Sequence, residues 1–194
     1  MVQAPIQTTT KELAILAVDL IRQAGCEYGD IRICHDRQQN LSASDRSLNR
    51  LSDNVSSGFG VRVLLDGAWG FVASHRITPA EITRIVNLAV ETAKGSRLTQ
   101  QEAVKLVPVE AYQDRYITPI KIDPFTVPIQ EKAELLLQIN EQFLSYQDKG
   151  IKKAYSFLSF AQEDKIFAST VGSIIEQTLY RSYPGMGCTA IANG

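Results

Sequence analysis

The sequence predicts an α+β fold: helices pack on an antiparallel sheet in an N-terminal module, followed by a linker, a helix and a strand-rich second region. Two amphipathic helical patterns flank a segment of alternating apolar residues, and a third helical pattern precedes further alternating segments. Helix, meander and helix in succession are typical of an α+β module, because each helix must bury its apolar stripe against the sheet. With 44% apolar residues in 194, the chain can bury one or two cores.

The first predicted helix begins after Thr9. Thr9 and Glu12 have the T-x-x-E spacing of a capping box, in which each residue satisfies a backbone N–H of the other. Apolar residues then recur at helical spacing, and Gly25 is typical of a helix C-terminus. The apolar positions are Leu13, Leu16, Ala17, Leu20, Ile21 and Ala24.

Residues 58–73 carry the clearest strand pattern. Asp66-Gly67 separates two alternating runs, and this dipeptide favours a type I′ hairpin turn. The apolar residues are Phe59, Val61, Val63 and Leu65 before the turn and Trp69, Phe71 and Ala73 after it. A shorter alternation begins at Asp30, and the serine-rich residues up to Ser57 alternate only weakly.

A second capping box, Thr78-Pro79-Ala80-Glu81, predicts another helix, with proline where its missing N–H costs nothing. Gly95 is its expected end. These elements define an N-terminal module over residues 1–102.

Residues 103–127 are predicted to form a connector with at most short edge strands, because the periodicity of apolar residues fades and prolines accumulate. Pro128 opens a third helix, and residues 128–194 form a helix plus a truncated β-meander. Turns are expected at residues 162–164 and 172–173, and a break at residues 184–187. Asn193-Gly194 is a hairpin dipeptide without a returning strand, so we expect the sequence to be the front of a longer protein.

The charge balance excludes several classes of partner. Twenty Lys and Arg residues oppose 21 Asp and Glu residues, which argues against direct binding to nucleic acid or to an anionic membrane. Apolar stretches such as residues 14–18 fall short of the roughly 18 residues needed for a spanning helix. The polar N-terminus lacks the features of a secretory signal, so a cytoplasmic location is expected.

Motifs for catalysis are absent from the sequence. Cys26, Cys34 and Cys188 form no C-x-x-C, and we expect reduced thiols that pack as small hydrophobes. His35 and His75 are too far apart for H-E-x-x-H, and Cys34 and His35 point to opposite faces of a strand.

Other motifs also favour structural explanations. Gly58 and Gly60 begin a G-x-G, but Val63 replaces the glycine of a dinucleotide motif, so these glycines indicate a bulge or a close approach of backbone or of a partner. Glu163 and Asp164 are expected in a solvated turn.

Three segments, in order, resemble the TldD/PmbA family, also known as modulators of DNA gyrase. Residues Gly58–Phe71, GFGVRVLLDGAWGF, resemble a hairpin near the front of the family. Residues 118–132, which contain TPIKIDPF, VP and EK, resemble the segment that joins its first and middle regions. Residues 167–177, which contain FASTVG and IEQ, resemble its middle region and favour the TldD branch.

The resemblance implies a longer cytoplasmic peptidase that degrades unfolded or leader peptides as a homodimer or a TldD–TldE heterodimer. It implies a zinc ion held in the C-terminal region by H-E-x-x-x-H and a cysteine. None of these positions matches a residue of this chain, so no catalytic or metal residue is assigned. We expect this chain to be inactive alone and to serve architecture, dimerisation or substrate access.

The hairpin supplies the candidates for a substrate channel, which are Gly58, Gly60, Arg62 and Trp69. Extended strands can receive a peptide by β-addition, which uses mainly backbone groups. The alternative is that the hairpin only forms the core of the first module. For the whole protein, the alternatives are a non-catalytic PmbA/TldE-type partner subunit or a peptide-binding interaction module, while the charge balance disfavours DNA or gyrase binding.

Overall fold

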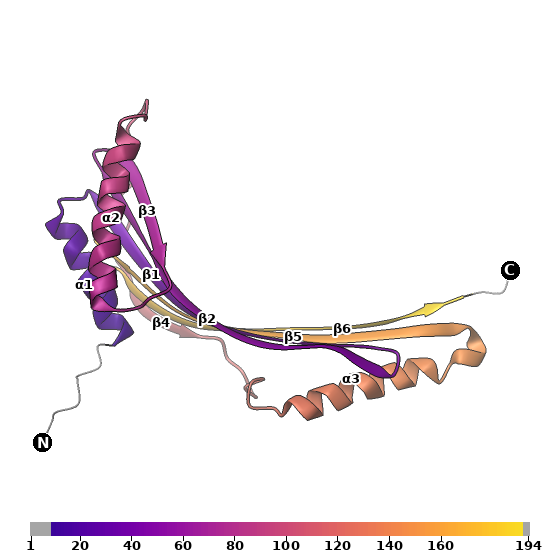
Figure 1. The fold of residues 1–194 in the computed structure, drawn as a ribbon. Helices are drawn as coiled ribbons and strands as arrows, with labels where there is room; N and C mark the ends of the chain where they lie inside the picture. The colour runs from indigo at the N-terminus through magenta and orange to yellow at the C-terminus, as the bar shows by residue number, and fades with distance from the viewer. Residues whose placement is uncertain (1–8, 192–194) are drawn as a thin grey trace, which may run out of the picture. The chain divides into compact units, whose positions relative to one another are not determined.

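The computed structural model describes residues 9–191, which contain three α-helices and a six-stranded mixed sheet (Figure 1). The predicted α+β class is confirmed. The helices are α1 (Thr10–Gln23), α2 (Pro79–Arg97) and α3 (Ile129–Leu144), and a short 3₁₀ helix spans Gln147–Lys149. The strands are β1 (Tyr28–Ser44), β2 (Ser47–Leu65), β3 (Ala68–Ser74), β4 (Gln113–Ile117), β5 (Ile151–Ser169) and β6 (Ile174–Ala190). Their order in the sheet is β3-β2-β1-β5-β6-β4.

The described residues divide into two compact units. Unit 1 contains the residues up to His35, Ser57–Ile117 and Asp164–Thr178, and unit 2 contains Asp36–Ser56, Thr118–Glu163 and the residues from Leu179. Strands β1, β2, β5 and β6 contribute residues to both units. The division of the sequence at residues 1–102, 103–127 and 128–194 remains a prediction.

In unit 1, α1 begins and ends as its sequence predicts. The Thr9 side chain accepts a hydrogen bond from the Glu12 N–H at 3.3 Å, and the Thr9 N–H donates to the Glu12 carboxylate at 2.7 Å. Gly25 has a φ of 73°, the left-handed conformation that ends many helices. The apolar side of α1 packs with α2 and one face of the sheet, and the buried apolar residues of this core are Leu13, Ala14, Ala17, Val18, Ile21, Ile31, Ile33, Phe59, Val61, Val63, Ile82, Ile85, Val86, Ala89, Val90, Ala93, Ile166 and Ala168.

The predicted hairpin is confirmed. Strands β2 and β3 pair antiparallel from Phe59 opposite Ser74 to Leu65 opposite Ala68. Asp66 and Gly67 connect them with φ values of 50° and 71°, which is the left-handed pair that a type I′ turn requires.

A glycine lets α2 approach β3 closely. A Cβ atom at Gly70 would lie 2.0 Å from the carbonyl oxygen of Ala89 and 2.6 Å from the backbone nitrogen of Ala93. Since both obstacles are backbone atoms of α2, only glycine fits at this position. Helix α2 itself continues through Gly95, the expected end, to Arg97.

The serine-rich segment is regular, contrary to its weak sequence pattern. Strand β1 extends to Ser44, and β2 begins at Ser47. Asp45, at φ 52°, forms the turn between them, and its carboxylate accepts a hydrogen bond from the Ala154 N–H at 2.9 Å. Apolar alternation missed these strands because many of their residues are polar.

In unit 2, helix α3 lies along the strands (Figure 1). As predicted, it begins directly after Pro128, and it buries Leu136 against Leu41 and Ala43. It also buries Lys132 and Asn140, which an apolar stripe does not predict.

The turn expected at residues 162–164 is wrong, because β5 continues through it. Glu163 pairs with Arg181 at 3.3 Å in unit 2, and in unit 1 Asp164 accepts a hydrogen bond from the Thr178 hydroxyl at 2.6 Å. These partners on β6 allow two adjacent carboxylates to remain in a strand. The turn at Gly172 is confirmed by its φ of 107°.

The break expected at residues 184–187 is also wrong, since β6 is continuous there. A Cβ atom at Gly185 would lie 2.2 Å from the Phe157 ring, and one at Gly187 would lie 2.5 Å from the Tyr155 hydroxyl. Aromatic side chains of β5 therefore cover the two glycines, an arrangement that keeps glycine in a sheet.

The connector contains the short edge strand that the sequence allows. Strand β4 pairs parallel with β6, with Gln113 opposite Ile174, and all five of its residues are exposed. Asn193-Gly194 lies outside the described residues. None of the helices in residues 9–191 combines the length and the apolar character that a membrane span requires.

Candidate functional site

The candidate residues of β2 lie on the face of the sheet that points away from α1 and α2. Phe59, Val61 and Val63 are buried in the helix-packed core, so strand alternation directs Gly60 and Arg62 to the opposite face. Leu64 follows Arg62 by two residues and therefore points to the same face. Trp69 shares that face as well, because it lies directly opposite Leu64 in the hairpin.

The two candidate glycines permit close approaches but do not line the same pocket as Arg62. A Cβ atom at Gly60 would lie 2.9 Å from the Phe71 ring, and one at Gly58 would lie 3.1 Å from the Ser74 carbonyl oxygen. The prediction of a close backbone approach is confirmed at Gly58, whereas the neighbour of Gly60 is an aromatic side chain.

Arg62 and Trp69 are brought together in one cluster. The guanidinium carbon of Arg62 lies 4.7 Å from the centroid of the Trp69 ring and 5.9 Å from that of Tyr28. The two rings meet edge to face at 5.9 Å. Cation–π and edge-to-face geometries both stabilise such arrangements, so the guanidinium and the two rings form one cluster in which each group contacts the other two.

Asp30, which the sequence did not single out, anchors this arginine from β1. Its carboxylate Oδ2 accepts hydrogen bonds from Arg62 Nη2 at 2.6 Å and from Nε at 3.0 Å. The Asp30 side chain is 1% exposed and that of Arg62 is 39% exposed. A buried carboxylate that binds a half-exposed guanidinium holds the cation in place without removing it from solvent.

A second arginine also contacts Asp30. Arg32 Nη1 lies 3.2 Å from Asp30 Oδ1, and its guanidinium lies 5.1 Å from the Phe167 ring centroid.

Burial raises the pKa of the Tyr28 hydroxyl, and the Asp30 charge raises that pKa further. The phenol therefore stays protonated near neutral pH and can donate a hydrogen bond.

The cluster opens into a pocket of about 460 Å³. Most of its walls are apolar, with Arg62 and Glu27 as the charged groups. The lining residues are Glu27, Tyr28, Arg62, Trp69, Leu106, Val107, Pro108, Val109 and Val171. Sequence reasoning missed the wall at residues 106–109, because the connector carries no periodic pattern and reaches this position only through tertiary structure.

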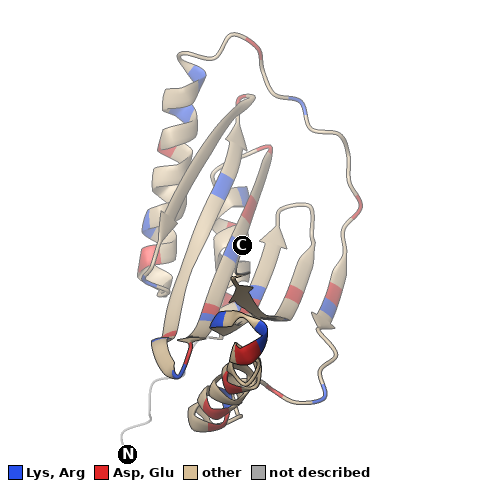
Figure 2. Cartoon of the chain, turned by 90° about the vertical axis from the view of Figure 1, so that its right-hand side faces the viewer, with Lys and Arg blue, Asp and Glu red and all other residues tan. Residues whose placement is uncertain are grey.

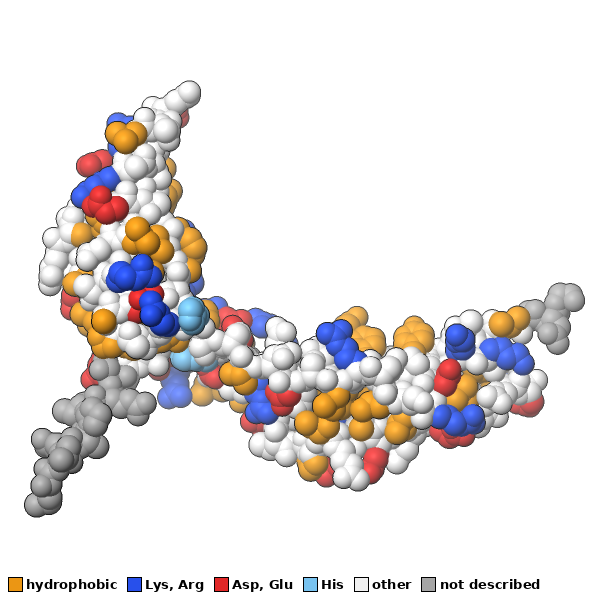
Figure 3. All heavy atoms as spheres, in the orientation of Figure 1, with side chains coloured by type: hydrophobic (Ala, Val, Ile, Leu, Met, Phe, Trp, Pro, Cys, Tyr) orange, Lys and Arg blue, Asp and Glu red, His pale blue; other side chains and the backbone are white. Residues whose placement is uncertain are grey.

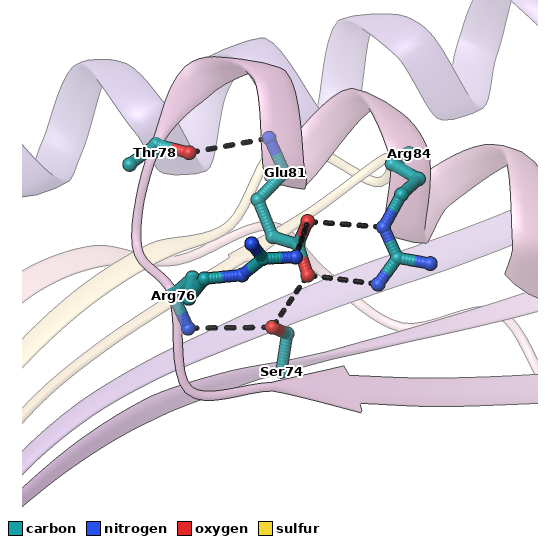
Figure 4. A network of polar contacts seen from close by, with 5 residues as sticks. All are labelled: Ser74, Arg76, Thr78, Glu81 and Arg84. Atoms are coloured by element: carbon teal, nitrogen blue, oxygen red, sulfur yellow. Dashed lines mark hydrogen bonds and ion pairs between the residues drawn. The ribbon is translucent and has the colours of Figure 1, made fainter.

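A separate polar network connects β3 to α2 (Figure 4). The Glu81 carboxylate accepts hydrogen bonds from the Ser74 hydroxyl at 2.7 Å, from Arg84 at 2.8 and 3.0 Å and from Arg76 at 3.1 Å. The hydrogen bonds from Arg84 and Ser74 lower the pKa of Glu81 to about 2. Thr78 caps the Glu81 N–H as predicted, but the carboxylate binds these three side chains instead of closing the capping box.

The main polar cluster of unit 2 surrounds Lys132. Its ammonium donates hydrogen bonds to the Gln39 side-chain oxygen and to the Pro124 carbonyl, and it lies 4.9 Å from the Phe160 ring centroid. Burial lowers the pKa of Lys132. The Gln39 amide in turn donates to Asp53 at 2.8 Å. This cluster ties the connector before α3 to β1.

The histidines and cysteines do not converge. His35 Nδ1 lies 2.8 Å from the Ser57 hydroxyl, and His75 is exposed. None of the three cysteines forms a disulfide, and Cys188 is exposed, so its assignment as a buried hydrophobe is wrong. Across residues 9–191 no group of three or more His, Cys, Asp or Glu side chains is arranged to hold a metal ion. These residues do not fit a zinc site, and no metal-dependent step is assigned to them.

The family model and the relatives that match this chain are all described as metallopeptidases or metalloproteases. Residues 29–93, which include Asp30, Arg62 and Trp69, match the model of the PmbA/TldA metallopeptidase domain 1. A metalloprotease of Methanocaldococcus jannaschii is 32% identical over 168 residues, which cover 87% of this chain and 37% of that protein. A metalloprotease of Synechocystis is 24% identical over 80% of this chain and 32% of its own length. The chain thus spans about a third of these curated relatives.

Solved structures share the fold. A proposed modulator of DNA gyrase from Bacteroides thetaiotaomicron has a TM-score of 0.74 at 16% identity, over 97% of this chain and 43% of that one. TldE from Thermococcus kodakarensis has a TM-score of 0.60 at 14% identity, over 91% of this chain and 40% of that one.

Proposed function

This chain belongs to the PmbA/TldD metallopeptidase family through its first domain, and from that premise we propose that it is the N-terminal part of a TldD-type zinc peptidase of the cytoplasm. The full protein would degrade unfolded or leader peptides, as a homodimer or with a TldE-type partner. Hydrolysis would take place at a zinc ion held by residues that are not among these 194. The role proposed for this chain is to guide extended peptides toward that centre.

The observation that carries the substrate role is the Arg62 cluster. Asp30 binds the guanidinium, the Trp69 and Tyr28 rings lie 4.7 and 5.9 Å from it, and Arg62 lines the pocket together with both rings. Such preorganisation lowers the cost of binding, because little side-chain entropy remains to be lost. Acidic and basic side chains lie among each other on the visible surface of each unit (Figure 3), which supports a peptide ligand over a polyanion.

The test uses the full-length protein, with its metal content and the cleavage of an unfolded peptide as readouts. We expect bound zinc, and we expect Trp69→Leu to raise KM several-fold while the zinc content stays unchanged. Phe71→Leu is the matched control, because Phe71 lies on the same hairpin and its ring is outside the pocket. An unchanged KM in Trp69→Leu would refute the substrate role, and a zinc-free, inactive protein would refute the peptidase.

A non-catalytic partner subunit is the second candidate, supported by the structural similarity to TldE. The two candidates differ outside this chain. The full-length gene separates them: H-E-x-x-x-H with a downstream cysteine supports the peptidase, and a continuous reading frame without that motif supports the partner subunit.

A further inference from the structure

The connector after α2 contains a stretch of unpaired backbone beside the pocket. Its ends are anchored, since the Val104 N–H donates to the Gly67 carbonyl and the Ile174 N–H donates to the Tyr112 carbonyl, each at 2.8 Å. Between these anchors, the backbone groups of residues 105–111 make no hydrogen bond to other described residues. Figure 2 shows this connector as a long trace without regular structure before β4.

Apolar side chains on this stretch are unusually exposed. Val107 is 80% exposed and Val109 is 64% exposed, yet both also contribute to the pocket wall. A segment with unpaired backbone groups and exposed apolar side chains is a template for the addition of another strand.

The charged groups of the pocket fit an oxygen acceptor. Arg62 directs Nε and Nη2 to Asp30, so that carboxylate does not use its Nη1 donors. Arg32 also lies beside Asp30, so two guanidinium groups share one carboxylate, and the Arg62 N–H donors that Asp30 does not use can bind a carbonyl oxygen. The pocket also contains the Glu27 carboxylate, which accepts a hydrogen bond from the Gly67 N–H at 2.8 Å, so a neutral carbonyl oxygen fits this site better than a carboxylate.

We propose that unit 1 binds an extended peptide along residues 105–111 and takes one large apolar side chain of that peptide into the pocket beside Trp69. Arg62 binds a carbonyl oxygen of the same peptide. The pocket volume of about 460 Å³ admits a leucine or phenylalanine side chain. This inference rests on the proposed function and adds a substrate class to it, namely unfolded segments that contain an apolar residue.

The test measures binding of fluorescent ten-residue peptides to the metal-stripped full-length protein by anisotropy. The peptides differ at one central position, which is Leu, Phe or Ser. We expect the Leu and Phe peptides to bind at least about tenfold more tightly than the Ser peptide, as burial of one such side chain predicts. Backbone N-methylation next to that position is expected to weaken binding by a similar factor.

Val107→Asp is the decisive variant, because Val107 is too exposed for its replacement to prevent folding. It should abolish the preference for Leu over Ser. Val55→Asp is the matched control, since Val55 is 73% exposed and lies outside the pocket. It should preserve that preference.

The outcomes separate the two proposals. If the intact protein cleaves peptides but Val107→Asp keeps the wild-type preference, the pocket assignment is overturned and the peptidase stands. If no peptide binds and none is cleaved, both fail. Saturation of the site by a second copy of the protein, seen as concentration-dependent dimerisation that Val107→Asp abolishes, would also overturn the peptide assignment.

Discussion

Units 1 and 2 share four strands but hold their helices by different means. Among the described residues, the buried apolar core of unit 1 has 18 members, whereas the corresponding cluster of unit 2 has three. Two of the four buried residues of helix α3 are polar, and one of them, Lys132, donates hydrogen bonds to the Gln39 side chain and the Pro124 carbonyl. Unit 1 is therefore specified by the amount of apolar surface it buries, and unit 2 by particular polar partners.

The two strategies respond differently to substitution. Each large apolar side chain that becomes fully buried contributes about 1.5–3 kcal/mol, and losses are spread over many neighbours. A buried polar group contributes little in net terms but costs about 1–3 kcal/mol when its partner is removed. The comparison predicts that unit 1 loses most stability when a substitution adds atoms to its packed core. Unit 2 should lose most stability when a substitution removes a hydrogen-bond partner.

The largest effect is expected at the contact between α2 and β3. Gly70→Ala places a Cβ atom against the Ala89 carbonyl, so α2 must move away from the sheet. We expect a loss of about 3 kcal/mol, at the upper end for overpacking, because backbone cannot yield as a side chain can. Urea denaturation followed by Trp69 fluorescence measures it, since Trp69 is the only tryptophan of the chain and lies in unit 1.

Gly95→Ala is the matched control for Gly70→Ala. A Cβ at Gly95, which is within α2, would meet no described atom within 4 Å beyond its chain neighbours and the adjacent backbone of its own helix. This variant should gain about 0.5–1 kcal/mol through helix propensity. Equal midpoints for Gly70→Ala and the wild type would show that the helix can shift without loss, contrary to the tight contact.

In unit 2, the next largest effect is expected from Lys132→Met. Lys132 is 4% exposed, and the substitution leaves the Gln39 oxygen and the Pro124 carbonyl without this donor. We expect a loss of about 2 kcal/mol by urea denaturation monitored by circular dichroism. The exposed Lys153→Met serves as control and should change stability by less than about 0.5 kcal/mol. A more stable Lys132→Met would mean that methionine packing outweighs the buried charge, as can happen with buried ion pairs.

The same difference explains what the sequence could predict about the fold. Helices α1 and α2 and the β2–β3 hairpin follow from apolar periodicity, caps and the Asp66-Gly67 turn, because unit 1 is organised by apolar burial. The polar halves of β1 and β2 and the continuity of β5 and β6 escaped prediction. Their regularity depends on cross-strand partners, such as Arg181 for Glu163 and Phe157 for Gly185, which no local pattern reveals.

The candidate site was predictable to a similar extent. Arg62 and Trp69 stand in one hairpin, so a single motif identifies both. Asp30 comes from β1, and Val107 comes from the connector. Their proximity to Arg62 and Trp69 is a property of the tertiary structure, although strand alternation does place Asp30 on the face opposite Ile31.

At Asn140 of unit 2, the removal of a polar side chain is expected to raise stability. It is 0% exposed, and neither polar atom of its side chain has a hydrogen-bond partner among the described residues. Asn140→Leu should therefore raise stability by about 1 kcal/mol in urea denaturation, because the amide no longer has to be desolvated without compensation. Leu136→Asn, one turn earlier on α3, is the reciprocal control and should be strongly destabilising. A destabilised Asn140→Leu would show that the amide is bound in the folded protein.

The effect that depends most on pH is expected at Glu81, a polar contact within the apolar unit. Its pKa is about 2 in the folded protein, against an ordinary value of 4.5. The carboxylate therefore stabilises the fold above pH 4.5, and this contribution is lost as the pH falls from 4.5 toward 2. Glu81→Gln should flatten the decline of stability over that interval, measured by urea denaturation at successive pH values. Glu131→Gln, at an exposed position of α3, should retain the wild-type decline. If Glu81→Gln retains the wild-type decline as well, the arginines around Glu81 do not bind its carboxylate when the protein is in solution. Unit 1 would then depend on apolar burial even at this position.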